Sequence, residues 1–335
     1  MPDKKIIEPE FARRFPNLAS PRFGSRVVGA SDEFFGAKER LISDAPPVFI
    51  PDKYDEHGKW MDGWESRRRR DTGHDWCVVD LGADGVIRGI EIDTSYFTGN
   101  YPPAASLEAC MKDANIDDPS VWKTILPKVS LEGDKRQFHA ISDDGVWGAV
   151  RLNIFPDGGV ARMRLYGEVA PSWGDASEDA LVELSALKKG GSIIAYNDAH
   201  YGDLWALLSE GRGKTMGDGW ETRRRREPGN DWIIIALAAR GVVEAIEIDT
   251  AHFKGNFPES ASVEGVDFTG EADGSLVEEA VSWREILPRQ KLQADCVHEF
   301  GDADISSLGL VTHVRLNIYP DGGVSRFRVF GRRAQ

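Results

Sequence analysis

Apolar and polar residues alternate in several short stretches of this chain, which is the pattern of β-strands with one buried face. Residues 162–166 and 326–330 alternate cleanly. Residues 86–94 alternate in part, and the strand period predicts one face made by Val86, Arg88, Ile90 and Ile92 and another made by Ile87, Glu91 and Asp93. The chain therefore contains amphipathic strands.

Turn signals separate these strands. Residues 156–159 read Pro-Asp-Gly-Gly and predict a turn, because proline fixes φ and glycine permits positive φ. Residues 35–41 and 204–208 are candidates for short helices. Short strands, tight turns and little helix together predict an antiparallel β-sandwich.

The chain also repeats itself. The block DGWESRRRR at 62–70 returns as DGWETRRRR at 218–226, and IEIDT at 90–94 returns at 246–250. RLNIFPDGGV at 151–160 returns at 315–324 with one change, Phe155 to Tyr319. The offset drifts along the chain, which indicates small insertions in surface loops.

The repeat and the length of 335 residues predict two domains, 1–170 and 171–335. Residues 171–175, Pro-Ser-Trp-Gly-Asp, are a candidate linker.

Composition limits the function classes. With 41% hydrophobic and 29% charged residues the chain is typical of a globular protein, and it has no apolar run of membrane-spanning length. Residues 1–12 lack the apolar core of a signal peptide. The three cysteines are scattered, which favours reduced thiols and a cytoplasmic location. A net charge of −14 disfavours nucleic acid and anionic membranes as partners.

The duplicated arginine runs oppose this negative charge. In an extended stretch Arg67 and Arg69 share one side and Arg68 and Arg70 the other. One pair could bind a carboxylate through the bidentate guanidinium fork, while the other pairs with acidic neighbours or stacks on Trp64. Alternatively, all four form ion pairs within the scaffold. Two short clusters do not make a basic stripe, so a small organic anion fits better than a nucleic acid.

Other candidates are less distinctive. Glu91 and Asp93 share a strand face, as do Glu247 and Asp249, and such pairs bind amide groups or a cation, act as acid and base, or pair with arginine. The seven histidines form no metal-binding motif. His74 is replaced by Asn230 in the second half, and His252 stands where the first half has Tyr96. One half is active, or histidine is not essential, or both halves complete one site.

Several of these motifs occur in the order typical of one enzyme family. They are NLAS at 17–20, SDEFF at 31–35, the two GWExRRRR blocks, IEIDT with FxGNxP at 90–102 and 246–258, and both RLNIxPDGGV segments. In these residues the chain resembles the allantoicase (allantoate amidinohydrolase) family. The resemblance implies an all-β fold, a tandem duplication of a galactose-binding-like jelly-roll β-sandwich, and a homo-oligomer.

The resemblance also implies a hydrolase that converts allantoate to (S)-ureidoglycolate and urea in purine breakdown. No resident cofactor is expected, since the chain lacks the DxHxD ligands of arginase-like enzymes. Asp32 or Glu33 could supply oxygen ligands to a structural divalent cation.

The chemistry of allantoate then suggests roles for the duplicated residues. Its carboxylate needs arginine, its ureido groups need acceptors and donors, and loss of urea needs a proton and an activated water. The catalytic candidates are Glu65, Glu221, His74 and His252. The candidates for substrate binding are Arg67, Arg69, Arg223, Arg225, Trp64, Trp220, Asp93, Asp249, Asn100 and Asn256.

Two other functions compete with this one. A non-catalytic small-ligand or carbohydrate-binding sandwich would use the same fold, because fold does not fix function. A pure assembly protein would place the duplicated motif at an interface. Against both, the two units fill the chain and leave no separate catalytic domain to serve.

Overall fold

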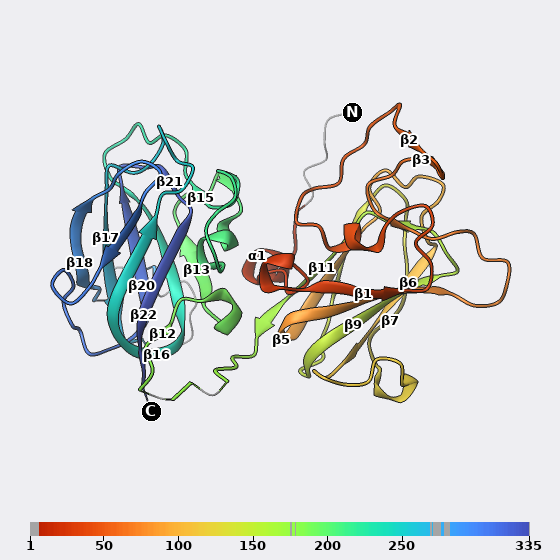
Figure 1. Cartoon of the computed structure of the whole chain (residues 1–335), viewed down its shortest axis with the longest axis horizontal. Coiled ribbons are helices and arrows are strands. Elements are labelled where there is room, and N and C mark those ends of the chain that lie inside the picture. The colour runs from red at the N-terminus through yellow and green to blue at the C-terminus, as the bar shows by residue number, and fades with distance from the viewer. Residues whose placement is uncertain are drawn as a thin grey trace. The chain divides into compact units, whose positions relative to one another are not determined.

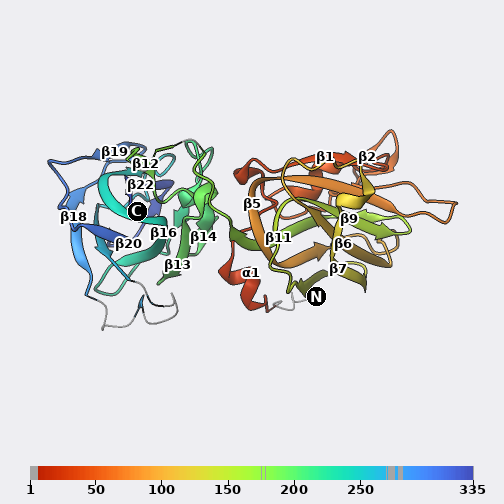
Figure 2. The ribbon, with the colours of Figure 1, turned by 90° about the horizontal axis from the view of Figure 1, so that it is seen from below.

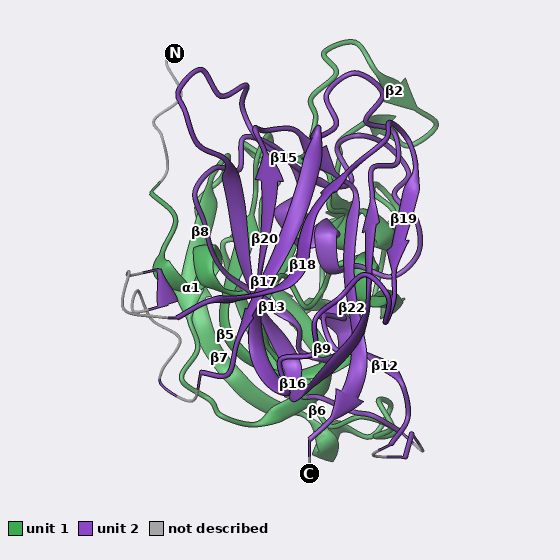
Figure 3. Ribbon diagram, turned by 90° about the vertical axis from the view of Figure 1, so that its left-hand side faces the viewer, with its two compact units in different colours: residues 1–170 green, residues 171–335 purple. Residues whose placement is uncertain are grey.

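The computed structural model describes residues 7–174, 176–177, 179–268, 270, 276–277 and 282–334. The chain forms two compact units, residues 1–170 and 171–335, which Figure 3 distinguishes by colour. The regular secondary structure of both units is mainly strand, so the predicted all-β class with a duplicated β-sandwich is confirmed. The candidate linker begins unit 2, although its last residue, Asp175, lies outside the described residues, as do residues 1–6 of the N-terminal segment.

Unit 1 contains eleven strands and four short helical segments within its described residues (Figure 1). The strands are β1 (Arg26–Ala30), β2 (Tyr54–Asp55), β3 (Gly58–Lys59), β4 (Trp64–Glu65), β5 (Asp75–Asp93), β6 (Ala104–Cys110), β7 (Lys123–Ser130), β8 (Arg136–Ala140), β9 (Val146–Phe155), β10 (Gly159–Val160) and β11 (Arg162–Val169). The helical segments are α1 (Glu10–Arg14), η1 (Pro21–Phe23), η2 (Lys38–Ile42) and η3 (Pro119–Val121).

Strand β5 belongs to both layers of the unit 1 sandwich (Figures 1 and 2). Its first half, 75–80, pairs with β1 and β9, and its second half, 85–93, pairs with β8 and β11. The main sheet runs in the order β1-β5-β9-β6-β7. Between the halves, a Cβ on Gly82 would lie 1.8 Å from the carbonyl oxygen of Phe23, so this position requires glycine.

A bulge in β5 corrects the predicted strand faces. Tyr166 of β11 pairs with Gly89 and the next residue pairs with Ile87, so Arg88 is an extra residue in the ladder. The alternation of side chains between the two faces shifts by one residue there. Ile87 therefore shares a face with Ile90, and both are buried. Prediction from a strict two-residue period was therefore wrong for Ile87, because a bulge cannot be seen in the alternation.

Unit 2 repeats this design around the 19-residue β16. The first half of β16 pairs with β13 and β20, its second half with β19 and β22, and the sheet order is β12-β22-β16-β20-β17-β18. The elements are β12 (Val182–Glu183), η4 (Leu187–Lys189), β13 (Ser192–Tyr196), β14 (Tyr201–Gly202), η5 (Leu204–Leu208), β15 (Trp220–Glu221), β16 (Asp231–Asp249), β17 (Ser260–Val266), β18 (Arg284–Lys291), β19 (Val297–Phe300), β20 (Leu310–Tyr319), β21 (Gly323–Val324) and β22 (Arg326–Arg333). The two predicted helices are the 3-10 segments η2 and η5.

Two short strands bring the duplicated motifs together in each unit. Strand β4 pairs with β10, so Glu65 faces Gly159, and in unit 2 β15 pairs with β21 in the same way. A Cβ on Gly159 would lie 2.0 Å from Cε1 of Phe97, so only glycine lets that buried ring pack beneath the pair. The GWE and GGV motifs are thus two halves of one local structure.

Unit 1 carries an insertion beside this structure. Between η2 and β4 it has 21 residues (43–63), whereas unit 2 has 11 (209–219) between η5 and β15. The extra residues form the hairpin of β2 and β3. Buried Arg162 fixes the segment, because its guanidinium donates to the carbonyl of Ala45 at 2.8 Å and bonds the carboxylate of Asp62 at 2.8 Å.

Among the described residues no helix has the length and apolar character needed to cross a lipid bilayer.

Candidate active site

The side chain of Glu65 stands at the wall of a cavity of about 510 Å³ in unit 1. Only 8% of Glu65 is exposed, and its Oε1 accepts a hydrogen bond of 2.6 Å from Nδ2 of Asn100. Burial penalises the charged carboxylate and raises the pKa of Glu65 above its ordinary value, although the Asn100 bond opposes this. A carboxyl with a raised pKa in a cavity is suited to act as a general acid or base.

Arg67 and Arg69 are held by the protein's own carboxylates. Nε and Nη2 of Arg67 bond Asp32 at 2.8 and 2.6 Å. Nε of Arg69 bonds Asp71 at 2.9 Å and its Nη1 bonds Asp75 at 2.8 Å. These guanidinium groups are therefore committed to stabilising the loops around the cavity.

Arg68 differs from Arg67 and Arg69 in its exposure and its contacts. Its side chain is exposed, lines the same cavity as Glu65, and forms no ion pair or hydrogen bond with any other residue in the described ranges. Arg67 and Arg69, the arginines expected to bind substrate, are thus the two with acidic partners, and Arg68 is the one that faces the cavity. The backbone amides explain this, because those of Arg67 and Arg69 donate to Asp32 and Asp157 and turn the intervening residue outward.

Unit 2 has an equivalent cavity of about 740 Å³. Asn256 donates to Glu221, Arg223 pairs with Asp198 at 3.2 Å, and Nη2 of Arg225 bonds Asp231 at 2.7 Å. The copy of Arg68 is Arg224, which is exposed, lines the cavity, and has no hydrogen bond or ion pair within the part of the chain described here. In each unit, therefore, a glutamate, an asparagine and an arginine without an acidic partner among the described residues line the same cavity.

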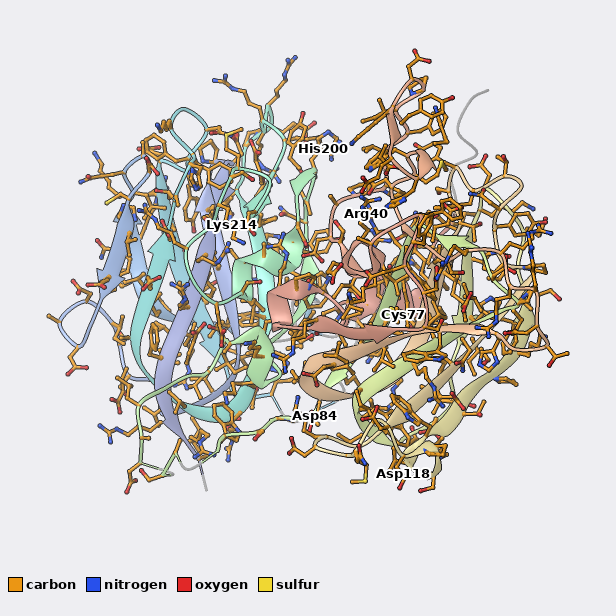
Figure 4. All side chains as sticks on the ribbon, turned by 45° about the vertical axis from the view of Figure 1, so that its right-hand side comes forward. Arg40, Cys77, Asp84, Asp118, His200 and Lys214 are labelled. Carbon is orange, nitrogen blue, oxygen red and sulfur yellow. The ribbon has the colours of Figure 1, made fainter. Side chains whose placement is uncertain are left out.

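The two cavities differ in detail. Glu221 is more exposed than Glu65. Tyr201 replaces Phe35, and Lys291 and Glu259 line only the unit 2 cavity. His200 lies at the end of unit 2 that contains β15, where its amide donates to the carbonyl of Glu221 at 3.0 Å (Figure 4).

A second cavity of about 570 Å³ adjoins the first in unit 1. Both cavities are lined by Glu65, Asn100 and Phe35, so the catalytic candidate Glu65 stands between them. The inserted hairpin supplies part of the wall of this second cavity. The other residues that line the second cavity are Phe49, His57, Lys59, Met61, Tyr96, Thr98 and Asp134. Sequence reasoning missed the four that belong to the insertion (Phe49, His57, Lys59 and Met61) because this segment has no counterpart in the second half, and repetition was the main signal.

Four of the predicted substrate-binding residues do not line the cavities described above: Trp64, Trp220, Asp93 and Asp249. Trp64 and Trp220 are fully buried, and their indole Nε1 atoms each donate at 2.8 Å to the backbone carbonyls of Asp32 and Asp198. Asp93 is 1% exposed and accepts from the amide of Ser95 at 2.8 Å, and burial raises its pKa. Neither Asp93 nor its copy Asp249 lines the cavities described above.

Comparison with known proteins now identifies the family. A family model described as the allantoicase repeat matches residues 16–170 and again residues 182–334. The chain belongs to the allantoicase family.

Relatives of this allantoicase-family chain match it along nearly its whole length. Probable allantoicase 2 of Burkholderia pseudomallei is 52% identical over 97% of both chains, and the probable allantoicase of Ralstonia nicotianae is 49% identical over 99% and 98%. The crystal structure of allantoicase from Saccharomyces cerevisiae is 35% identical, with a TM-score of 0.80 over 96% of this chain and 94% of that one. The family favours the enzymatic interpretation over a carbohydrate-binding module.

Within this allantoicase-family fold the two histidine candidates lie outside the cavities described above. Nε2 of His74 is 3.3 Å from Oδ1 of Asn153, and its ring packs on Phe155. Asn230 makes the matching contact with Asn317 in unit 2. Nε2 of His252 is 2.7 Å from the carbonyl oxygen of Gly213.

The candidate cation ligands have basic partners. Asp32 accepts from Arg67, which together with backbone bonds lowers its pKa despite partial burial. Glu33 accepts from Nζ of Lys38 at 2.8 Å, and the pKa of Glu33 is likewise lowered. Within the described ranges no group of three His, Cys, Asp or Glu side chains is arranged to hold a metal ion.

Proposed function

We propose that this chain is an allantoicase that hydrolyses allantoate to (S)-ureidoglycolate and urea, and that Glu65 of unit 1 is its acid and base. One observation carries the assignment. A buried carboxyl with a raised pKa and an unpaired guanidinium, those of Glu65 and Arg68, line one cavity. A proton donor beside an anion-binding group is what hydrolysis of a small ureido acid requires.

Arg68 binds the carboxylate of allantoate in this proposal. Its guanidinium offers two parallel N–H donors, and no protein carboxylate in the described residues competes for them. The amide of Asn100 donates to Glu65 through Nδ2, which leaves its Oδ1 to accept an N–H of a ureido group. Charge recognition by Arg68 and amide recognition by Asn100 together orient the central carbon over Glu65.

Glu65 then handles both protons. Its protonated carboxyl transfers a proton to the ureido nitrogen as the bond between that nitrogen and the central carbon breaks, and urea departs. Water forms the new carbon–oxygen bond and gives one proton to the Glu65 carboxylate. The carboxyl regains the proton that it lost, so the overall reaction consumes one water and yields ureidoglycolate and urea.

Two observations favour unit 1 over unit 2 as the catalytic unit. Glu65 is more deeply buried than Glu221, and burial is what raises the pKa of Glu65. The hairpin cavity on the far side of Glu65 gives unit 1 room for both ureido groups of the substrate. We assign anion binding alone to the cavity at Glu221 and Arg224.

Matched glutamine variants test the assignment. Urea release from allantoate should fall by at least about 100-fold in E65Q, the scale of general acid–base catalysis, and by less than about twofold in E221Q. Equal losses in both variants would assign the reaction to both units. Full activity in E65Q would contradict the role of Glu65.

Arg68 has a matched control in its neighbour. R68M should raise KM for allantoate at least about tenfold, because a hydrogen-bonded charge contributes about 1.5–3 kcal/mol. R67M removes an exposed pair with Asp32 and should change KM little. A normal KM in R68M together with a raised KM in R67M would restore Arg67 as the substrate ligand.

We further propose a cytoplasmic, homo-oligomeric protein. All three cysteines are free thiols, and Cys77, labelled in Figure 4, and Cys110 are buried within unit 1. Free thiols fit a reducing compartment. Sedimentation analysis of the purified protein tests the oligomer, and a monomer at micromolar concentration would contradict it.

A further inference from the structure

We infer that the hairpin cavity of unit 1 is the binding site for the ureido group that leaves as urea, with Lys59 and Tyr96 as its ligands. This inference rests on the function proposed above and adds the residues that distinguish the leaving group. The site combines apolar walls with a few polar groups, as small-molecule sites do.

The walls suit a flat, neutral group. Phe35, Phe49 and Met61 line the cavity, and the ring of Phe49 stacks on that of Tyr96 with centroids 5.5 Å apart. Phe49 and Tyr96 are 45% and 41% exposed, which is high for aromatic residues that contact each other. A planar ureido group lying against the exposed parts of these rings would cover apolar surface that now meets water.

The polar groups match the atoms of urea. Nζ of Lys59 forms no ion pair with any carboxylate of the described residues. It makes one long hydrogen bond of 3.5 Å to the carbonyl of Ile50 and lies 5.0 Å from the ring centre of Phe49, so further N–H donors remain for a ligand. The hydroxyl of Tyr96 forms no hydrogen bond within the same ranges. Lys59 can donate to the ureido oxygen as negative charge develops on the leaving group, and one oxygen of Asp134 can accept its N–H.

The backbone holds Tyr96 in position at a conformational cost. Tyr96 has a φ of 69°, a left-handed conformation that is unusual for a large aromatic residue. The amide of Tyr96 donates to Oδ1 of Asp134 at 2.8 Å, which fixes this conformation. In unit 2, His252 has the same φ and the same amide bond to Asp295, but its ring nitrogen is near the carbonyl of Gly213. A side-chain polar group at this position without a hydrogen bond among the described residues is thus found in unit 1 and not in unit 2.

The position of Glu65 completes the geometry. Glu65 and Asn100 line both unit 1 cavities, with Arg68 in one and Lys59 in the other. A substrate whose carboxylate binds Arg68 and whose leaving ureido group binds Lys59 places the breaking carbon–nitrogen bond beside Glu65. The shorter loop of unit 2 provides no β2–β3 hairpin, which agrees with catalysis in unit 1 alone.

Product inhibition tests this inference separately from turnover. Glyoxylate formed from the ureidoglycolate product is measured while urea or acetate is added as inhibitor. K59M and Y96F should each raise the inhibition constant of urea about threefold or more and leave that of acetate unchanged. R68M should do the reverse. The matched control is K53M, because Nζ of Lys53 lies over the ring of Trp60 at 3.5 Å and Lys53 does not line the cavity.

The possible failures are distinct. Unchanged urea inhibition and unchanged kcat/KM in both K59M and Y96F, with active wild-type protein, would overturn this inference and leave the proposed function standing. Absence of allantoate turnover by the wild-type protein would overturn the proposed function and this inference with it. Y96F removes only the hydroxyl and keeps the ring, so it still tests the inference if K59M does not fold.

Discussion

Asn100→Ala should move the pH dependence of catalysis in a defined direction. Asn100 donates to Glu65 at 2.6 Å, and this bond favours the charged form of Glu65 and lowers its pKa against the raising effect of burial. Removal of the amide leaves burial unopposed, so the pKa of Glu65 rises further. A bond to a charged group contributes about 1.5–3 kcal/mol, and the exposure of Asn100 places this one near 1.5 kcal/mol.

The assay is the pH profile of kcat/KM, followed by urea release. If protonated Glu65 is the acid, activity falls as pH rises through its pKa, and in N100A this limb should move to higher pH. N100A also removes the Oδ1 acceptor proposed for the ureido group, so the maximum of kcat/KM should fall as well. The matched control is N256A, which removes the equivalent donor to Glu221 and should leave the profile unchanged. An unmoved limb in N100A would refute the role of Glu65, and a limb that moved only in N256A would transfer catalysis to unit 2.

Three further predictions concern stability. R162M should lower the free energy of unfolding by about 3–5 kcal/mol in guanidinium chloride, because it removes a buried guanidinium that bonds the carbonyls of Ala45 and Asp62 and the half-buried Asp62 carboxylate; a loss below about 1 kcal/mol would contradict this. G159A should cost about 1–3 kcal/mol by overpacking against Phe97, and an unchanged Tm would show that the ring moves freely. Burial raises the pKa of Glu183 from 4.5 to about 7, so the wild-type protein loses stability as pH rises through that interval. The Tm of E183Q relative to wild type should therefore increase from pH 4.5 to 8, and parallel Tm curves would refute the shift.

The arginine run shows how far local pattern reasoning reaches. The two-residue period correctly separates Arg67 and Arg69 from Arg68, because neighbouring side chains in an extended segment point to opposite sides. Which side meets carboxylates is a different question. For Arg67 it is decided by Asp32, which lies 35 residues away, whereas the guanidinium of Arg69 bonds Asp71 and Asp75, only two and six residues along the chain. The backbone amide of Arg69 is held by Asp157, 88 residues away, so the orientation of the run depends on contacts that no local pattern contains.

The hairpin cavity was even harder to predict from the sequence. Lys59 and Tyr96 are not neighbours in the chain, and the hairpin occurs in one repeat only. The repeat focused attention on residues that both halves share, whereas Lys59 and Tyr96, the proposed ligands of the leaving group, differ between them. An unmatched segment next to a matched motif was the available signal.

The sequence alone determined the duplication, the all-β class and the motifs that surround the cavities, since strand alternation, turn glycines and recurring blocks are local properties. Tertiary structure decided which guanidinium groups are free, how far Glu65 is buried and where the bulge at Arg88 resets the strand faces. The reason is that charge pairing and burial depend on segments brought together by folding, and their separation along the chain leaves no periodic trace.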